Sequence, residues 1–477
     1  MMSVQQNTAL RSWMLEAAAG LMCSLLCIAL LVAAPTRAFA YVSNNDIVAG
    51  QPMSERDLTV AQQIDIDAPF ACMIDSNGLI YFERGAHEPL KIASMTKIMT
   101  AILALENSSP TDILTVSYRA ATVGESSANL REGDQMTMFN MLCCLLIPSG
   151  NDAATAIAEF IGEKALALGW DLGLEEGEEP PTDPFDAFVC LMNKKGRELE
   201  LEDSVFTNPH GLDDGVWYSD MHSTPYDVCL MARYAMQFDD FRRIVCSTGA
   251  TVDVVRGGET RQLSLTTTDW FLASYAYATG VKTGSTDYAG YCFVGSSKYL
   301  DLELYAVVLQ CDDENSRFID VQNMHVWGFL HRVEYNPVNS DETVTVADKS
   351  GSHEELLFAE VAHPGWIDRT FKTYLENPDE ILVLFDIDGN ITQRIQWASL
   401  DGNIKKGQVV GTVEFLQHNR VVCTKNIIAA EDCPAPDMFQ SVRIWVDRMK
   451  LSFQGKDSVA LTRIANTLPR IVDKTTA

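Results

Sequence analysis

A serine and a lysine stand three residues apart within residues 92–100, at Ser94 and Lys97. Apolar residues recur at helical spacing through this stretch, which predicts an amphipathic helix. Residues i and i+3 of a helix are neighbours, so the Ser94 hydroxyl and the Lys97 amine can share one face. A serine hydroxyl is a poor nucleophile until a base takes its proton, and a lysine with a lowered pKa can act as that base. The pair predicts a nucleophile and its base, although an isolated S-x-x-K is more often part of an ordinary surface helix.

A second pair of polar side chains, Ser149 and Asn151, follows the helix-ending Pro148. Helical patterns are predicted before this proline, through residues 138–146, and again directly after the pair. A Ser-x-Asn held in a tight loop between two packed helices can point both side chains toward one site. Two other S-x-N triplets occur in the chain, but neither lies between two helix ends.

A lysine, a threonine and a glycine follow one another at Lys282, Thr283 and Gly284, in a stretch that is predicted to be extended. Such a strand presents a cation and a hydroxyl, and the glycine lets a ligand approach the backbone closely. This combination suits the binding of a carboxylate. An isolated K-T-G is more often a surface lysine in an ion pair, so this motif depends on the other two for its meaning.

The elements around these motifs predict an α+β domain over residues 60–335. Residues 71–82 are predicted to be two strands joined by an Asn-Gly turn, and helical patterns follow up to residue 236. Three successive strands are then expected, at residues 278–284, 291–296 and 302–310. Helices followed by consecutive strands indicate an antiparallel sheet flanked by helices. Residues 168–184, acidic and rich in glycine and proline, are predicted to form a solvated insert.

The C-terminal part of the chain has a different pattern. Short strands separated by turn residues predict a small, sandwich-like all-β domain at residues 340–434. In residues 438–477, apolar residues recur at spacings of three and four, and seven basic residues outnumber three acidic ones. This basic amphipathic tail is predicted to bind an anionic membrane surface. The alternative is a helix that packs on the β domain.

Composition and the N-terminus indicate an exported globular protein of more than one domain. The chain has 477 residues, 47% hydrophobic and 21% charged, with a formal net charge of -29. That charge argues against nucleic acid as a partner. Residues 1–40 predict a signal peptide, because a positive flank at Arg11 precedes an apolar run and an Ala-Phe-Ala cleavage site. An uncleaved membrane anchor is the alternative. If cleavage occurs, residues 41–477 form an extracytoplasmic protein, which is expected to be peripheral on the outer face of the cytoplasmic membrane.

The cysteine pattern predicts no metal site. Two of the twelve cysteines, Cys23 and Cys27, lie in the predicted signal peptide. The other ten would enter a compartment where disulfides can form, with a pairing that the sequence leaves open. Their spacing matches no zinc or redox motif.

Taken together, the three motifs resemble those of penicillin-binding proteins and class A β-lactamases. S-x-x-K and K-T-G each occur once in the chain. The sequences around all three, and an Asn-Pro-His-Gly-Leu stretch at residues 208–212, are similar to the D-alanyl-D-alanine carboxypeptidases over residues 68–335. The β domain and the tail also resemble the C-terminal half of that family. The chain departs from the family at Lys91-Ile92, where proline is usual, and in the acidic insert.

The resemblance implies a serine peptidase that needs neither a metal nor an organic cofactor. By position, Ser94 would attack the carbonyl between two D-alanines, and Lys97 would act as the general base. Ser149 would relay the proton to the departing D-alanine. A neutral Lys97 near pH 7 requires burial and a nearby positive charge, which Lys282 could supply.

The remaining matched positions are implied to bind the substrate. Asn151 would orient the substrate amide, while Lys282 and Thr283 would hold the terminal carboxylate beside Gly284. The backbone amides of Ser94 and Ser285 would form an oxyanion hole, which is usually the largest electrostatic contribution to such a reaction.

The implied activity is the removal of the terminal D-alanine from peptidoglycan stem pentapeptides, with β-lactams as covalent inhibitors. A β-lactamase is one alternative, but class A enzymes hold a deacylating water with the glutamate of an E-x-x-x-N stretch. The positions four residues before Asn193 and Asn208 are Val189 and Ser204, so that glutamate is missing. A cell-wall-binding scaffold of the same fold, or a transpeptidase with an amine acceptor, would also be consistent with the three motifs.

Overall fold

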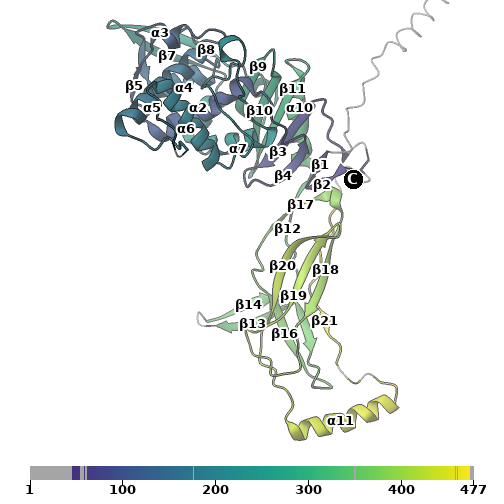
Figure 1. The fold of residues 1–477 in the computed structure, drawn as a ribbon. Helices are drawn as coiled ribbons and strands as arrows, with labels where there is room; N and C mark the ends of the chain where they lie inside the picture. Colours follow the sequence, from purple (N-terminus) through teal and green to yellow (C-terminus); the bar gives the residue numbers. More distant parts are fainter. Residues whose placement is uncertain are drawn as a thin grey trace, which may run out of the picture. The chain divides into compact units, whose positions relative to one another are not determined.

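The computed structural model describes residues 46–53, 58–59, 62–175, 177–348, 351–456, 458 and 460–472, so the predicted signal peptide at residues 1–40 lies outside it. Two compact units are present (Figure 1): one contains residues 64–326 and the segment before residue 58, and the other contains residues 58–63 and 327–477. The predicted boundary at residues 335–340 falls inside the second unit. The reason is that β12 (Arg332–Tyr335) pairs with β17 (Leu382–Phe385), a strand of the β domain.

A seven-stranded antiparallel sheet, in the order β2-β1-β4-β3-β11-β10-β9, is the centre of the first unit. Its strands are β1 (Ile47–Val48), β2 (Gln51–Pro52), β3 (Phe70–Asp75), β4 (Ile80–Arg84), β9 (Ala278–Thr286), β10 (Gly290–Tyr299) and β11 (Leu302–Cys311). The predicted hairpin is confirmed as β3 and β4, and the three predicted successive strands are confirmed as β9, β10 and β11. Strand β9, which carries the K-T-G motif, ends the sheet order.

Helices cover this sheet and form the rest of the first unit's core (Figure 1). They are α2 (Lys97–Asn107), α3 (Tyr118–Ala121), α4 (Met138–Leu146), α5 (Asn151–Leu168), α6 (Pro184–Glu198), α7 (Pro225–Ala235), α8 (Asp239–Val245), α9 (Phe271–Ser274) and α10 (Ser316–His331), whose last turns belong to the second unit. The predicted apolar stripe of α2 is buried: Ile98, Met99 and Ile102 are each 0% exposed. Helix α4 begins and ends as its pattern predicts, and α2 packs against α4, α5 and α7.

A second, four-stranded sheet in the first unit was not predicted. Its strands are β5 (Ile113–Thr115), β6 (Gln135–Thr137), β7 (Gly249–Arg256) and β8 (Glu259–Thr266). The first two are three residues long, which is too short for a period of two to be recognised.

The second unit is built on a six-stranded sheet in the order β18-β19-β20-β16-β15-β21. Its strands are β15 (Ala359–Ala362), β16 (Thr370–Leu375), β18 (Ile391–Trp397), β19 (Val409–Gln417), β20 (Arg420–Ala429) and β21 (Arg463–Ile464). A separate hairpin joins β13 (Thr343–Asp348) to β14 (Gly351–Leu356). The predicted C-terminal β domain is therefore present, with its own buried apolar core.

The structure divides the predicted tail of residues 438–477 into two parts. The first is helix α11 (Met438–Phe453), which begins with a capping box between Asp437 and Gln440. The second returns to the β domain, where β21 pairs with β15 and Ile471 is buried. An exposed amphipathic helix and a segment packed on the β domain are therefore both present, each in a different part of the tail. No helix in the described ranges is long and apolar enough to cross a bilayer.

The ten cysteines of the described residues all carry free thiols. The adjacent pair Cys143 and Cys144 is buried in the core of the first unit. The buried cysteines therefore act as small apolar side chains, whereas Cys246 is exposed and Cys190 and Cys423 are half-buried.

Candidate active site

Ser94 and Lys97 lie at the start of α2, where a turn of 3-10 helix, η3 (Ala93–Thr96), leads directly into the α-helix. The Lys97 amine donates a hydrogen bond to Ser94 Oγ at 2.8 Å and another to the carbonyl of His210 at 2.7 Å. Lys97 is 0% exposed. The helical spacing in the sequence thus gives the predicted contact, with Ser94 on the turn before the helix.

Residues 208–212, the Asn-Pro-His-Gly-Leu stretch, form a loop that packs against the turn η3. This contact gives the stretch a structural role. A Cβ atom at Gly211 would lie 1.9 Å from the carbonyl oxygen of Ala93, and Gly211 also has a φ of +91°, so only glycine fits there. The Thr100 hydroxyl donates to the carbonyl of Pro209 at 2.6 Å. The loop therefore fixes both the nucleophile's turn and the carbonyl that binds Lys97.

Ser149 and Lys282 form a second contact. Ser149 lies between α4 and α5 with a φ of 64°, a left-handed conformation that few non-glycine residues adopt. Lys282, 1% exposed on β9, donates hydrogen bonds to Ser149 Oγ at 2.9 Å and to the carbonyl of Thr283 at 2.9 Å. The Ser-x-Asn motif in the α4–α5 loop and the K-T-G motif on β9 are therefore joined by the hydrogen bond between Lys282 and Ser149.

Asn151 is the first residue of α5 and is buried beside this contact. Its side-chain amide donates to the carbonyl of Gly124 at 3.0 Å, which fixes the orientation of the side chain. Among the residues that the structure describes, none donates to Asn151 Oδ1. A buried acceptor without a donor is costly, so this oxygen is available to an N–H group of a ligand.

Gly284 brings the two contacts into one site. A Cβ atom at this position would lie 2.7 Å from the carbonyl oxygen of Ile92 and 3.3 Å from the backbone nitrogen of Ser94. Strand β9 therefore runs against the turn that carries Ser94. Ser285 follows on the same strand and is exposed. The residues singled out from the sequence thus lie where three parts of the unit meet: the junction of η3 and α2, the α4–α5 loop with the start of α5, and β9.

The two lysines have unusual electrostatics. Burial lowers the pKa of Lys97 well below its ordinary value, the positive charge of Lys282 lowers it further, and Asp152 acts in the opposite direction. Burial also lowers the pKa of Lys282 to about 7, with Arg317 acting in the same direction and Asp269 against it. A neutral amine at Lys97 can accept a proton from Ser94, and an ammonium at Lys282 can hold an anion.

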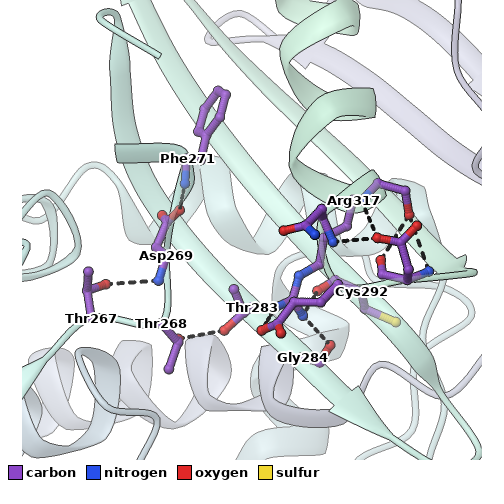
Figure 2. Close-up of polar contacts among 12 residues, drawn as sticks. Thr267, Thr268, Asp269, Phe271, Thr283, Gly284, Cys292 and Arg317 are labelled. Atoms are coloured by element: carbon purple, nitrogen blue, oxygen red, sulfur yellow. Dashed lines mark hydrogen bonds and ion pairs between the residues drawn. The ribbon is translucent and has the colours of Figure 1, made fainter. Parts of the chain in front are cut away.

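Asp269 and Arg317 flank β9 and were not found from the sequence (Figure 2). Asp269 is 4% exposed, accepts a hydrogen bond from the backbone N–H of Phe271 at 3.0 Å, and burial raises its pKa to about 7. The preceding Thr268 shares a 2.7 Å hydroxyl contact with Thr283. Arg317, 3% exposed, directs its guanidinium at the carbonyls of Gly284 and Cys292, at 3.3 Å and 3.5 Å. No motif in the sequence marks either residue, because both reach the site through tertiary packing.

Asp152 supports the Ser-x-Asn loop and was also missed. Its carboxylate accepts hydrogen bonds from the backbone N–H groups of Ala128 and Leu130 and from the hydroxyl of Ser127. The Asn151 N–H donates to the carbonyl of Ser126 at 2.8 Å. These three donors from residues 127–130, together with the N–H of Ala153, fix the loop around the buried carboxylate beside Ser149. An acidic residue directly after Asn151 was the only signal of this role in the sequence.

Comparisons with known proteins agree with this geometry. The profile of a family described as D-alanyl-D-alanine carboxypeptidase matches residues 57–165 and 184–313, half of the chain. The unmatched interval lies at the predicted acidic insert. D-alanyl-D-alanine carboxypeptidase DacF of Bacillus subtilis (strain 168) is 29% identical over 390 residues, covering 80% of this chain and 90% of the relative. D-alanyl-D-alanine carboxypeptidase DacC of Escherichia coli (strain K12) is 28% identical over 413 residues, covering 80% of this chain and 87% of the relative.

The fold is shared with a solved structure, that of D-alanyl-D-alanine carboxypeptidase DacD from Francisella tularensis. That comparison has a TM-score of 0.57 at 21% identity and covers 80% of this chain and 98% of the other. The likeness extends beyond the first unit and includes the C-terminal β domain that the sequence predicts.

Proposed function

Because this chain belongs to the D-alanyl-D-alanine carboxypeptidase family and is a serine-type hydrolase, we propose that Ser94 is its nucleophile and Lys97 the general base. The observation that carries this proposal is the 2.8 Å contact between Lys97 Nζ and Ser94 Oγ, made by a lysine whose pKa is lowered. The Ser94 oxygen attacks the carbonyl of the penultimate D-alanine while its proton passes to Lys97. Collapse of the tetrahedral intermediate breaks the amide bond and leaves an ester on Ser94.

The departing D-alanine needs a proton on its nitrogen, and Ser149 relays to it the proton that Lys97 took from Ser94, so that Lys97 is neutral again. Its hydroxyl is bonded to Lys282 at 2.9 Å and lies at the entrance to α5. Asn151 accepts the substrate's amide N–H at its free Oδ1. Water then attacks the ester, with Lys97 again acting as the base, and Ser94 is regenerated.

The terminal carboxylate of the substrate is held by Lys282 and Thr283. Both side chains belong to β9, where Lys282 is a buried cation and Thr283 carries a hydroxyl braced by Thr268. The backbone amides of Ser94 and Ser285 form the oxyanion hole, and Gly284 between β9 and η3 permits this close approach. Binding of a chain end by its carboxylate explains why such an enzyme would be a carboxypeptidase.

β-Lactams would acylate the same serine, since they present a strained amide in place of the dipeptide. Slow deacylation is expected, because Val189 and Ser204 occupy the positions where a class A β-lactamase would need its glutamate. Rapid turnover of penicillin would instead favour the β-lactamase alternative. A transpeptidase would pass the acyl group from Ser94 to an amine in place of water. Adding an amine to the reaction and measuring the amount of acylated amine tests this alternative.

Mass spectrometry of the penicillin-treated protein, with the modified peptide mapped, tests the nucleophile. We expect one adduct, on Ser94, together with release of D-alanine from a pentapeptide by the untreated enzyme. Ser94→Ala should lose both signals. Ser108→Ala, at the other end of α2, is the matched control and should keep them. An adduct on another residue, or D-alanine release by Ser94→Ala, would refute the assignment.

We further propose that α11 binds an anionic membrane surface from the outer side of the cytoplasmic membrane. Phe439 and Phe453 are each 88% exposed and Trp445 is 61% exposed, so the helix presents an apolar face to solvent. Its opposite side is tied to the β domain, because Arg448 donates to the carbonyls of Pro364 and Trp366. An apolar face with basic neighbours is the pattern of helices that lie in a membrane interface. The predicted signal peptide would deliver the protein to that side.

Sedimentation with vesicles of anionic and of neutral lipid tests this second proposal. The double variant Phe439→Glu/Phe453→Glu should lose binding to anionic vesicles. Gln440→Glu/Gln454→Glu, outside the apolar face and exposed, introduces the same charge and should retain most of it. Equal loss in both variants would show that charge alone governs adsorption, and equal retention would exclude α11 as the contact.

A further inference from the structure

The proposed oxyanion hole is built from two separate parts of the chain. One amide belongs to Ser94 on the turn η3, and the other belongs to Ser285 on β9. The spacing of two such N–H groups must be held closely, because an oxyanion hole works through donors that are fixed in advance. Gly284 lets the two parts touch, but a contact of this kind does not stop them from separating. Their spacing therefore depends on what else ties β9 to the segment that leads into η3.

Residues 213–221, which we call the brace, are bonded to both of these parts. At the first residue of the brace, the carboxylate of Asp213 accepts a 2.8 Å hydrogen bond from the hydroxyl of Thr286, the residue after Ser285. The same hydroxyl accepts a hydrogen bond from the N–H of Ala289 at 3.0 Å, which fixes its direction. Asp213 is 0% exposed, and Thr286 is half-buried. This end of the brace is therefore fastened to β9 beside the oxyanion hole.

Lys91 fastens the other end of the brace to the segment before η3. The Lys91 ammonium donates hydrogen bonds to the carbonyls of Ser219 and Met221, at 2.6 Å and 2.8 Å. Lys91 is half-buried and stands three residues before Ser94. A hydrogen bond from a charged donor is roughly twice as strong as one between neutral groups. The segment that carries the nucleophile is therefore held firmly to this end of the brace.

The middle of the brace has less support than its ends. Val216 is 92% exposed and Tyr218 is 71% exposed. The ring of Trp217 reaches inward and lies edge to face with that of His210, with centroids 4.5 Å apart. Exposed loops with few packed side chains open at a low cost in free energy. The hydrogen bonds at the two ends are therefore the main restraint on the position of the brace.

Backbone pairing holds the chain directly after the brace. Leu90 and Ser223 exchange two backbone hydrogen bonds, of 2.8 Å and 2.9 Å. These bonds do not depend on the identity of any side chain. Removal of the Lys91 ammonium therefore frees residues 219–221 without detaching the segment that follows them.

We propose that the brace sets the spacing of the two oxyanion-hole amides, and that Lys91 is a positioning residue for the reaction. Lys91 acts through the backbone of Ser219 and Met221 and not on the substrate itself. The inference rests on the proposed function, because the oxyanion hole is part of that proposal. A brace that is loose at either end lets β9 and η3 move apart, which weakens the hydrogen bonds to the tetrahedral intermediate more than the binding of the peptide. The loss is therefore expected in the rate and not in the affinity.

Lys91→Met and Thr286→Val each release one end of the brace. Removal of a whole oxyanion-hole donor costs about 10²- to 10³-fold in kcat, so a loosened pair of donors should cost about tenfold in D-alanine release from a peptide ending in D-Ala-D-Ala. The Kd of that peptide, measured on the Ser94→Ala background, should change by less than about twofold in each variant. Lys91→Arg keeps a charged donor and should retain most of the rate.

The double variant Lys91→Met/Thr286→Val tests whether the two ends act together. Release of either end frees the brace, so the double variant should also lose about tenfold, and not the roughly 100-fold product of two independent effects. Lys194→Met is the matched control and should keep the wild-type rate. Lys194 is also half-buried and donates to a backbone carbonyl, that of Asp171 at 3.0 Å, but it lies on α6, which carries none of the site residues. A multiplied loss in the double variant, or an unchanged rate in both single variants, would overturn the brace.

Hydrogen exchange of the backbone amides separates this inference from the catalytic assignment. In the peptide-free protein, Lys91→Met and Thr286→Val should each speed exchange within residues 214–221, by about tenfold, whereas Lys194→Met should not. A wild type that releases no D-alanine would refute the proposed function, while faster exchange in the two variants would still support the brace. Unchanged exchange in both variants would refute the brace even if turnover falls.

Discussion

Gly284→Ala is expected to slow acylation of Ser94 by about 10- to 100-fold. The new Cβ atom would lie 2.7 Å from the Ile92 carbonyl oxygen and 3.3 Å from the Ser94 nitrogen. Both neighbours are backbone atoms, so no side chain can rotate away. Strand β9 and the turn η3 must therefore separate for the alanine to fit.

The size of the effect follows from that separation. A carbon and a carbonyl oxygen need roughly 3.3 Å, so the strand must move by about 0.6 Å from the turn. A misplacement of about 1 Å in a catalytic arrangement costs on the order of 10²-fold in rate. The same overpacking should cost about 1–3 kcal/mol of stability, too little to unfold most domains.

Stopped-flow acylation with a fluorescent penicillin measures the rate, and thermal unfolding checks that the variant is folded. Gly196→Ala is the matched control: it lies in helix α6 of the same unit, and its Cβ atom would meet only Phe206 at an ordinary 3.6 Å. A folded Gly284→Ala protein that acylates within twofold of wild type would refute the argument that β9 and η3 set the geometry of the site.

Three further predictions concern buried charges. Acylation should rise with pH through the lowered pKa of Lys97, because only the neutral amine accepts the Ser94 proton; a rate-pH profile without this acid limb would contradict the assignment of the base. For kcat/KM, an alkaline limb near pH 7 is expected as Lys282 loses its proton, and Asp269→Asn should move that limb to lower pH, since a negative charge that favours the ammonium is removed. If the alkaline limb does not move in Asp269→Asn, the charge of Asp269 does not influence the pKa of Lys282 and the prediction is wrong. Asp152→Ala should lower the free energy of unfolding by about 2–4 kcal/mol in urea, because two buried N–H groups lose their acceptor; Asp214→Ala, at an exposed position, should change it by less than about 0.5 kcal/mol.

Local patterns predict the fold where one element is long and regular. The hairpin of β3 and β4 follows from an Asn-Gly turn, and α4 begins and ends at the residues its apolar pattern indicates. The four-stranded sheet from β5 to β8 is different, because its two halves, β5–β6 and β7–β8, are joined by a pairing of Gln135 with Val255, more than a hundred residues along the chain. Pairing of that kind depends on tertiary contacts that no local period records.

The candidate site shows the same division. Ser94, Lys97 and Lys282 belong to recognisable motifs, because the chemistry proposed at each of these positions requires one particular type of side chain. Asp269 and Arg317 are buried and influence Lys282 through their charges. The sequence around them does not distinguish them from acidic and basic residues that lie on the surface. Their contribution depends on β9 passing between them and the turn at Ser94, a relation that exists only in three dimensions.

The return of the chain after α11 affects how the protein can be shortened for study. Truncation at residue 438 would remove the helix, but it would also take away β21, uncover the edge of β15 and leave a gap where Ile471 is buried. Exposed edges of this kind promote aggregation. A soluble version is better made by replacing residues 438–456 with a flexible Gly/Ser bridge, which keeps the last strand in its place.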